Sequence, residues 1–230
     1  MSTFKHKYLL LIFVLVSFEN FAQFGHSEFY AVGKFGFGMG MNSYTYNSNL
    51  NGTSMDLPRS IQIELGTGSI PEIGIGLKIT EAVYVEASVS YSFTQDFYKS
   101  GSGNEIFEQG YSFHRYAILI GGKYYVPVSE KFVMDFNGGF SYSLPEDLIV
   151  KMSGYTESIK YAGTNGLQFG FSGNYRVGVV SFSGGLRYRF EGFSIKPHQQ
   201  LPDDFESLNP NFQKISSTGI DVLFGAQYNF

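Results

Sequence analysis

Ile220-Asp221-Val222-Leu223-Phe224-Gly225-Ala226-Gln227-Tyr228-Asn229-Phe230, the last eleven residues, alternate between two kinds of side chain. Successive side chains of a strand point to opposite faces. The even-numbered residues are all apolar or aromatic, and they end in Tyr228 and Phe230. A soluble sheet rarely presents such a face outward, whereas a transmembrane β-barrel carries aromatic girdles around a lipid-facing surface. The stretch therefore predicts the closing strand of a barrel, with the chain ending at its rim.

The same alternation occurs seven times before this strand. Strands are expected over residues 29–42, 61–79, 83–94, 112–126, 132–142, 167–177 and 180–191. Short turns at 80–82, 127–131 and near Gly178 alternate with long loops at 43–60, 95–111, 144–164 and 192–214. Outer-membrane barrels have an even strand count, short turns at one end and long loops at the other. The prediction is an all-β, eight-stranded antiparallel up-and-down transmembrane β-barrel. A soluble β-sandwich shares the periodicity and is the alternative.

The second strand is the least regular of the eight. Gly66, Gly68 and Pro71 interrupt it, and proline removes a hydrogen-bond donor from a strand. We expect one strand with a bulge or break in its middle. Residues 61, 63 and 65 have the same parity as the isoleucines and the leucine of residues 73–79, and they are expected to share a face with them.

Composition limits the function classes. The chain has 230 residues, 18% aromatic and 16% charged, with 28 glycines and no cysteine or tryptophan. The absence of cysteine excludes disulfides, thiol chemistry and a lipidated N-terminal cysteine. The formal net charge is −4, and Lys and Arg do not cluster beyond the first seven residues. Nucleic acid is therefore not expected as a partner. No cofactor or metal is expected either.

The N-terminus reads as an export signal. Lys5 and Lys7 precede the apolar run Tyr8–Val16, which is too short to span a bilayer as a helix. Small and polar residues follow, and cleavage is expected after Ala22. We expect residues 1–22 to be a signal peptide and residues 23–230 to form an outer-membrane β-barrel domain.

The mature chain resembles small outer-membrane β-barrels of the OmpA/OmpX-like type, and in particular the outer-membrane β-barrel domain family of Gram-negative Bacteroidota. In such barrels the last strand carries a signal for the barrel assembly machinery. Gly225, Tyr228 and Phe230 match that signal, whereas Leu223 departs from it by standing at its polar position. The resemblance implies location in the outer membrane, with outer-membrane lipid and the assembly machinery as partners.

The inward faces of the predicted strands collect charged residues. They are Lys34, Glu64, Lys78, Glu86, Arg115, Lys123, Asp135, Arg176, Arg187, Arg189, Glu191 and Asp221. An eight-stranded barrel is just wide enough to be filled by its own side chains. A self-neutralising polar core is therefore favoured over a selective pore lining. If Val126 pairs with Phe132 across the short turn, Lys123 lies opposite Asp135.

Catalytic and metal-binding signals are weak. Of the mature chain's His26, His114 and His198, only His114 stands in a predicted strand, near Ser112. Some small barrels resemble lipid-modifying enzymes, but no carboxylate has a sequence reason to orient His114, so an enzyme is not expected. Acidic residues gather in the last long loop, at Asp203, Asp204 and Glu206. Their spacing matches no calcium loop, and a solvated acidic loop is favoured over a cation site.

The predicted loops are rich in aromatic residues, namely Tyr44, Tyr46, Phe97, Tyr98, Phe107, Tyr155, Phe205 and Phe212. They could bind a surface ligand or an envelope protein, or pack on one another over the barrel mouth. Three functions follow as hypotheses. The first is a structural or surface-interaction role carried by the loops, the second is a narrow channel for small solutes, and the third is a lipid-modifying enzyme.

Overall fold

The computed structural model describes residues 29–47, 60–102, 105–152, 155–197, 199 and 209–230. The predicted signal peptide, His26, His198 and the three acidic residues of the last long loop lie outside the described residues. No helix in the described part is long and apolar enough to cross a membrane.

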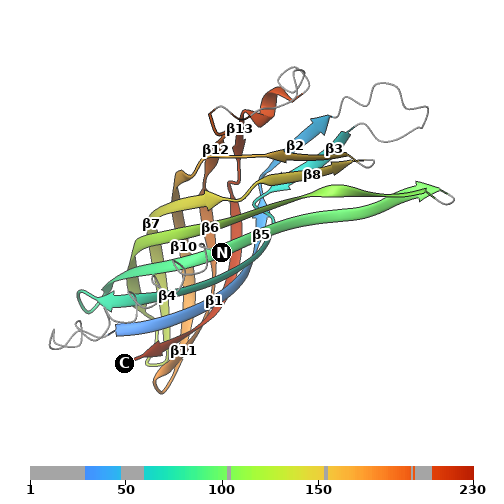
Figure 1. Ribbon diagram of the computed structural model, residues 1–230. Helices are drawn as coiled ribbons and strands as arrows, with labels where there is room; N and C mark the ends of the chain where they lie inside the picture. The colour runs from blue at the N-terminus through green and yellow to red at the C-terminus, as the bar shows by residue number, and fades with distance from the viewer. Residues whose placement is uncertain (1–28, 48–59, 103–104, 153–154, 198, 200–208) are drawn as a thin grey trace, which may run out of the picture.

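Eight antiparallel strands close into a barrel (Figure 1). They are β1 (Phe29–Gly40), β4 (Gly68–Lys78), β5 (Val83–Ser102), β6 (Glu105–Pro127), β7 (Phe132–Pro145), β10 (Thr164–Val177), β11 (Val180–Phe190) and β14 (Gly219–Asn229). Their order is β5-β4-β1-β14-β11-β10-β7-β6, and β5 pairs with β6 to close the ring. The last strand pairs with the first from Tyr30–Asn229 to Gly40–Gly219. The predicted fold and strand count are confirmed.

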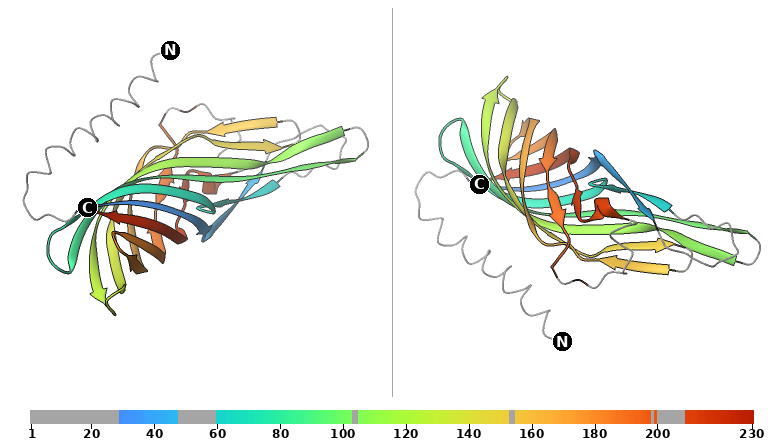
Figure 2. Two further views of the ribbon diagram at one scale, coloured as in Figure 1. Left: turned by 90° about the horizontal axis from the view of Figure 1, so that it is seen from below. Right: turned by 90° about the horizontal axis from the view of Figure 1, so that it is seen from above.

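The long connections at one end of the barrel differ from the prediction, because most of their described residues are strands rather than loops. They form β2 (Asn42–Asn47), β3 (Ser60–Leu65), β8 (Leu148–Met152), β9 (Tyr155–Ile159), β12 (Gly192–Ser194), β13 (Lys214–Ser216) and the 3-10 turn η1 (Pro210–Phe212). β5 and β6 pair as far as Ser102–Glu105. Figure 2 shows their hairpin projecting beyond the other strands.

The predicted second strand breaks at two glycines rather than at its proline. Gly66 and Gly68 have φ of 89° and 129°, a region that side chains disfavour. Pro71 lies within β4, opposite Phe35. The break also reverses the strand's faces: Ile63 is fully buried, whereas Ile73 is 68% exposed. The expectation that both share a face was wrong, and Glu64 is exposed rather than inward.

The predicted register across the 127–131 turn was wrong by two residues. The turn is tighter than expected, because the N–H groups of Val128 and Ser129 both donate to the carbonyl of Phe132 at 3.0 Å. The Ser129 hydroxyl accepts in turn from the Phe132 N–H at 3.1 Å. Lys123 therefore pairs with Asn137, and Asp135 pairs with Tyr125.

The outer face of the barrel is apolar between two sets of tyrosines. Along β6, the exposed residues Ile118 and Ile120 lie between Tyr116 and Tyr124. Tyr124 lies eight positions after Tyr116, which is about 26 Å along the strand and about 20 Å along the barrel axis at the usual strand tilt. The apolar band of outer-membrane barrels is about 25 Å tall. The outer face therefore has the pattern of a transmembrane β-barrel.

Candidate functional site: the lumen and the cap

Two glutamates hold the middle of the barrel lumen. Glu86 lies 2.6 Å from Lys34 Nζ and 2.5 Å from Lys123 Nζ, and it accepts the Tyr30 hydroxyl at 2.8 Å. Glu72 lies 2.8 Å from Lys34 Nζ and 2.5 Å from Arg187 Nη1. Lys34 thus bridges both carboxylates, and the residues joined in this way come from five different strands.

A second layer of ion pairs lies nearer the end with the long connections. Asp221 is 2.9 Å from Arg187 Nε and 3.3 Å from Arg189 Nη2. Glu191 contacts Arg115, and it accepts hydrogen bonds from the hydroxyls of Ser143 and Ser217 at 2.8 and 3.0 Å. Because Arg187 also binds Glu72, the two layers form one network across the lumen.

Asp135 stands apart, since no salt bridge among the described residues reaches it. It is fully buried and accepts hydrogen bonds from Asn137 at 3.0 Å, from Asn174 at 2.7 Å and from the Ser172 hydroxyl. The ion pair that the sequence predicted for it with Lys123 is therefore absent, because the register places Asn137 opposite Lys123.

The lumen charges balance. Five cations, Lys34, Lys123, Arg115, Arg187 and Arg189, face five anions, Glu72, Glu86, Asp135, Glu191 and Asp221. The space left between these side chains is small. One cavity beside the central glutamates has a volume of about 50 Å³, and another at the turn end, between Tyr125 and Arg176, has about 100 Å³. Such spaces hold a few water molecules. The described lumen is therefore a packed polar core.

Besides Glu64, two more residues expected in the charge network lie at the turn end of the barrel. Arg176 is exposed at the turn end, where its Nε donates to the Gly178 carbonyl at 3.1 Å. Lys78 is only half-buried, at the turn end of β4. Sequence reasoning missed Glu72 and Tyr30. Glu72 could have been found from the parity of β4 alone, since Ile73 and Ile75 beside it are outward.

The residues predicted as an assembly signal lie on both faces of β14. Tyr228 and Phe230 are exposed, with ring centroids 5.0 Å apart. Gly225 faces inward, where an added Cβ would come within 3.0 Å of both the Lys34 Cγ and the Ser183 Oγ. The Phe230 N–H donates to the Phe29 carbonyl at 2.9 Å, so pairing continues through residue 230.

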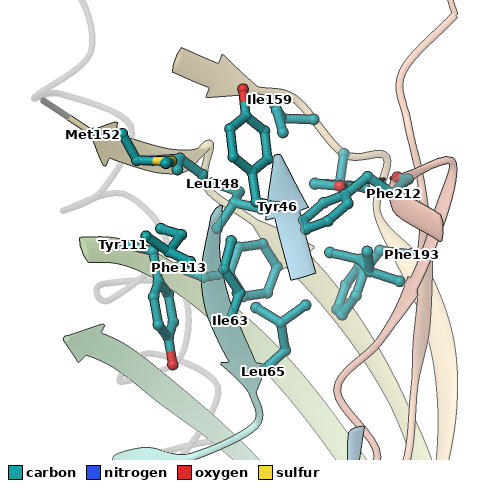
Figure 3. Packing of buried hydrophobic residues seen from close by; sticks show 14 residues of the cluster. Tyr46, Ile63, Leu65, Tyr111, Phe113, Leu148, Met152, Ile159, Phe193 and Phe212 are labelled. Carbon is teal, nitrogen blue, oxygen red and sulfur yellow. Dashed lines mark hydrogen bonds between the residues drawn. The ribbon is translucent and has the colours of Figure 1, made fainter. Parts of the chain in front are cut away.

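Above the lumen the long connections fold over a hydrophobic core (Figure 3). We call these connections, together with the core beneath them, the cap. Its buried residues are Tyr46, Ile61, Ile63, Leu65, Tyr111, Phe113, Leu148, Val150, Met152, Ile159, Tyr161, Phe193, Phe212 and Ile215. Of the aromatic residues predicted in loops, Tyr44 and Tyr46 each pack against Phe212 here, with ring centroids 5.8 and 5.6 Å from that of Phe212. The side chains of Tyr98, Phe107, Tyr155 and Phe205 lie outside the described part.

The cap is polar on its outer face. Ser43, Thr45, Gln62 and Glu64 of β2 and β3 are exposed, whereas alternate residues of β3 are buried. Two tyrosines tie the cap together. Tyr161 donates its hydroxyl to the Phe212 carbonyl at 3.0 Å, and the Tyr111 hydroxyl accepts from the Glu64 N–H at 2.9 Å. Burial raises the pKa of both phenols. With polar residues exposed and apolar residues buried, the outer face of the cap has the pattern of a protein surface in water.

His114 lies on the outer face of β6, with partners that the sequence did not indicate. The Tyr91 hydroxyl is 2.9 Å from its Nδ1, and Glu146 Oε2 is 3.5 Å from the same atom. A carboxylate therefore stands beside this histidine, contrary to expectation. Among the described hydrogen bonds, Ser112 is not a partner of His114, so the Ser–His pair considered from the sequence does not form.

No protein-family model and no curated protein sequence matches the chain. Solved structures do. The outer membrane protein OprG from Pseudomonas aeruginosa is 14% identical with a TM-score of 0.56, covering 89% of this chain and 96% of that one. Neisserial surface protein A is 14% identical with a TM-score of 0.49, covering 88% of this chain and 97% of that one. The likeness to OprG, at this identity, supports the barrel fold alone.

Proposed function

We propose that this protein is an integral outer-membrane β-barrel of a Gram-negative envelope, with a closed lumen and a structural or surface-interaction role carried by its cap. The observation that carries the proposal is the opposite patterning of the two regions. The barrel is apolar outside and charged inside, as lipid around it requires. The cap is polar outside and apolar inside, as water around it requires.

Location in the outer membrane follows from the same pattern. Open sheet edges are not tolerated in lipid, and this ring has none because β14 pairs with β1 and β5 with β6. We further propose that residues 1–22 are a signal peptide and that the chain is similar to the outer-membrane β-barrel domain family of Bacteroidota. The barrel assembly machinery would recognise Gly225, Tyr228 and Phe230. It assigns no catalytic role to His114.

The closed lumen argues for an interaction role over a channel. A solute path along the lumen would have to break the ion pairs of Glu72, Glu191 and Asp221, whose side chains are almost fully buried. Separating such pairs leaves uncompensated buried charges, at a cost of several kcal/mol each. A solute path would also have to open the core of the cap.

Two measurements test this proposal. In isolated outer membranes, the unheated protein is expected to migrate as a compact, detergent-resistant species that shifts on boiling. A soluble periplasmic protein without a shift would refute the location. The same folded protein in planar bilayers is expected to give no resolved conductance steps. Regular steps would replace the interaction role with the channel.

A further inference from the structure

The outer wall of the barrel is grooved where the ladder between β10 and β11 ends. The two strands pair only as far as Leu167–Phe190. Beyond this point β10 continues to pair with β7, up to Thr164–Ser143, while the chain after β11 turns into β12. The groove left between them has a volume of about 580 Å³. Most of its lining residues come from the ends of β10 and β11 and from β12 and β13, near the junction of the barrel and the cap, and Figure 1 shows these strands.

The lining of the groove changes from apolar to polar toward the cap. Its lower part is formed by Phe140, Leu167 and Phe190, whose side chains are 72%, 41% and 46% exposed on the outer face of the barrel. Its upper part is formed by Asn165, Ser216 and Thr218. The groove therefore presents an apolar wall at the level of lipid chains and hydrogen-bonding groups above it.

Three lysines lie beyond the polar end of the groove, on the outer face of the cap. Lys214 of β13 pairs with Ser194 of β12. Tyr161 and Ile195 form an isolated antiparallel β-bridge. Next to it the Lys196 N–H donates to the Lys160 carbonyl at 2.8 Å, so Lys160 and Lys196 are also opposite each other.

Residues opposite each other in a ladder share a face, as do alternate residues of one strand. Lys160, Lys196 and Lys214 therefore point outward together, while Phe193 and Ile215 between them point into the cap core. Lys214 is two residues, about 7 Å, from Ser216 in the groove.

The three lysines form no salt bridge with the described residues. All three are exposed, and no salt bridge in the described part includes any of them. The register of β8 and β9 brings Asp147 opposite Lys160. Asp147 is half-buried and accepts the Ser158 hydroxyl at 2.8 Å. Glu191 also lines the groove, but its side chain is buried and paired with Arg115. Among the described residues, the outer face above the groove therefore carries more positive than negative charge.

We propose that this groove and the lysines above it bind an anionic lipid of the outer leaflet, one whose head group carries a phosphate. The order apolar, hydrogen-bonding, cationic along the wall matches acyl chain, linkage and phosphate along such a lipid. Lysines at a membrane surface attract anionic head groups. This inference rests on the proposed outer-membrane location.

The test uses the full folded protein in detergent micelles and measures lipid binding by native mass spectrometry. The probes are dioleoyl phosphatidic acid, dioleoylglycerol, which has the same chains without the phosphate, and free glycerol 3-phosphate. The charge variant is Lys160→Gln/Lys196→Gln/Lys214→Gln. The matched control, Lys78→Gln/Lys131→Gln/Arg176→Gln, removes the same charge at the turn end.

A third variant fills the groove without changing charge. Gly192 also lines it, and an added Cβ there would meet only the Ile215 carbonyl oxygen, at 3.7 Å. Gly192→Phe is therefore expected to fold and to weaken binding of both lipids.

Phosphatidic acid is expected to bind at least about ten-fold more tightly than dioleoylglycerol, since lysines at a membrane surface attract an anionic head group. The charge variant should lose that preference and the control should keep it. Equal losses in both variants would refute the site in favour of diffuse charge. Glycerol 3-phosphate binding as tightly as the lipid would refute a lipid site. A protein that shows no heat-dependent shift would instead refute the outer-membrane location itself.

Discussion

β3 and β4 are consecutive along the chain, yet they face opposite ways. In β3 the isoleucines and the leucine are buried, and Gln62 and Glu64 are exposed. In β4, Glu72 is buried and Ile73 is exposed. Only Gly66 and Thr67 separate the two strands. The reversal shows that the surroundings of the outer face change there, from a medium that favours polar groups to one that favours apolar groups. On the proposed outer-membrane location, the boundary of the lipid lies at this short break.

The two regions are also held together differently. The barrel interior relies on ion pairs among residues from distant strands, with Arg187 joining Glu72 and Asp221. The cap relies on packing of apolar side chains. Directed charge pairs tolerate little change, since an unpaired buried charge is costly. Apolar packing tolerates more, because the surrounding residues relax partially around a lost group.

The largest effect is expected from Arg187→Leu. The substitution leaves the buried carboxylates of Glu72 and Asp221 without their shared partner. The free energy of unfolding should fall by about 3–5 kcal/mol, measured by urea titration of the folded barrel with far-UV circular dichroism. Arg176→Leu, at the exposed turn end, is the matched control and should cost less than about 1 kcal/mol. Equal losses in both variants would mean that the lumen network does not stabilise the barrel.

The next effect compares one substitution on the two sides of the break. Ile63→Ala removes a fully buried side chain from the cap core, whereas Ile73→Ala shortens one that is 68% exposed on the barrel. The first should cost about 2–5 kcal/mol and the second about 1 kcal/mol or less.

The readout is proteinase K cleavage of the cap in folded protein, together with the heat-dependent mobility shift. Ile63→Ala should expose the cap to cleavage while the shift persists. Faster cleavage in Ile73→Ala than in Ile63→Ala would contradict the assignment of faces.

The barrel could be predicted from the sequence because its signal is repeated. Each of the eight strands alternates between apolar and polar or small side chains. The alternation is regular over residues 220–230, nearly all of which form β14. The cap could not be predicted, because a period of two does not say which side of a strand is the core. Ile61, Ile63 and Leu65 would alternate identically facing lipid or facing the cap.

Two details of the lumen could not be predicted from the sequence, each for a local reason. Glu72 directly follows Pro71, which counts in the sequence as one of three interruptions of the strand, with Gly66 and Gly68. Only the two glycines break it, and Pro71 stays paired within β4. The pairing of Asp135 depends on a single turn, where the Ser129 hydroxyl holds the Phe132 N–H and shifts the register by two residues. One hydroxyl in a turn is invisible to an argument from hydrophobic alternation.

The smallest effect concerns pH and is confined to the cap. Burial raises the pKa of Tyr161 above that of an unfolded tyrosine, about 10. A raised pKa means that the neutral phenol stabilises the fold fully below pH 10, and that this contribution is lost as the pH rises above 10. The loss is about 1.4 kcal/mol for each pH unit until the folded pKa is reached. Cleavage of the cap by proteinase K should therefore accelerate between pH 10 and pH 11.

Tyr161→Phe separates this effect from general alkaline damage. The variant loses the hydrogen bond to the Phe212 carbonyl, so its cap should be about 1 kcal/mol less stable at pH 8. It should then lose less stability than the unmodified protein as the pH rises, because one buried phenol no longer titrates. Tyr111 remains, and burial raises its pKa as well, so part of the pH dependence should persist. Identical alkaline profiles for the two proteins would show that the Tyr161 phenol is not buried in a closed cap.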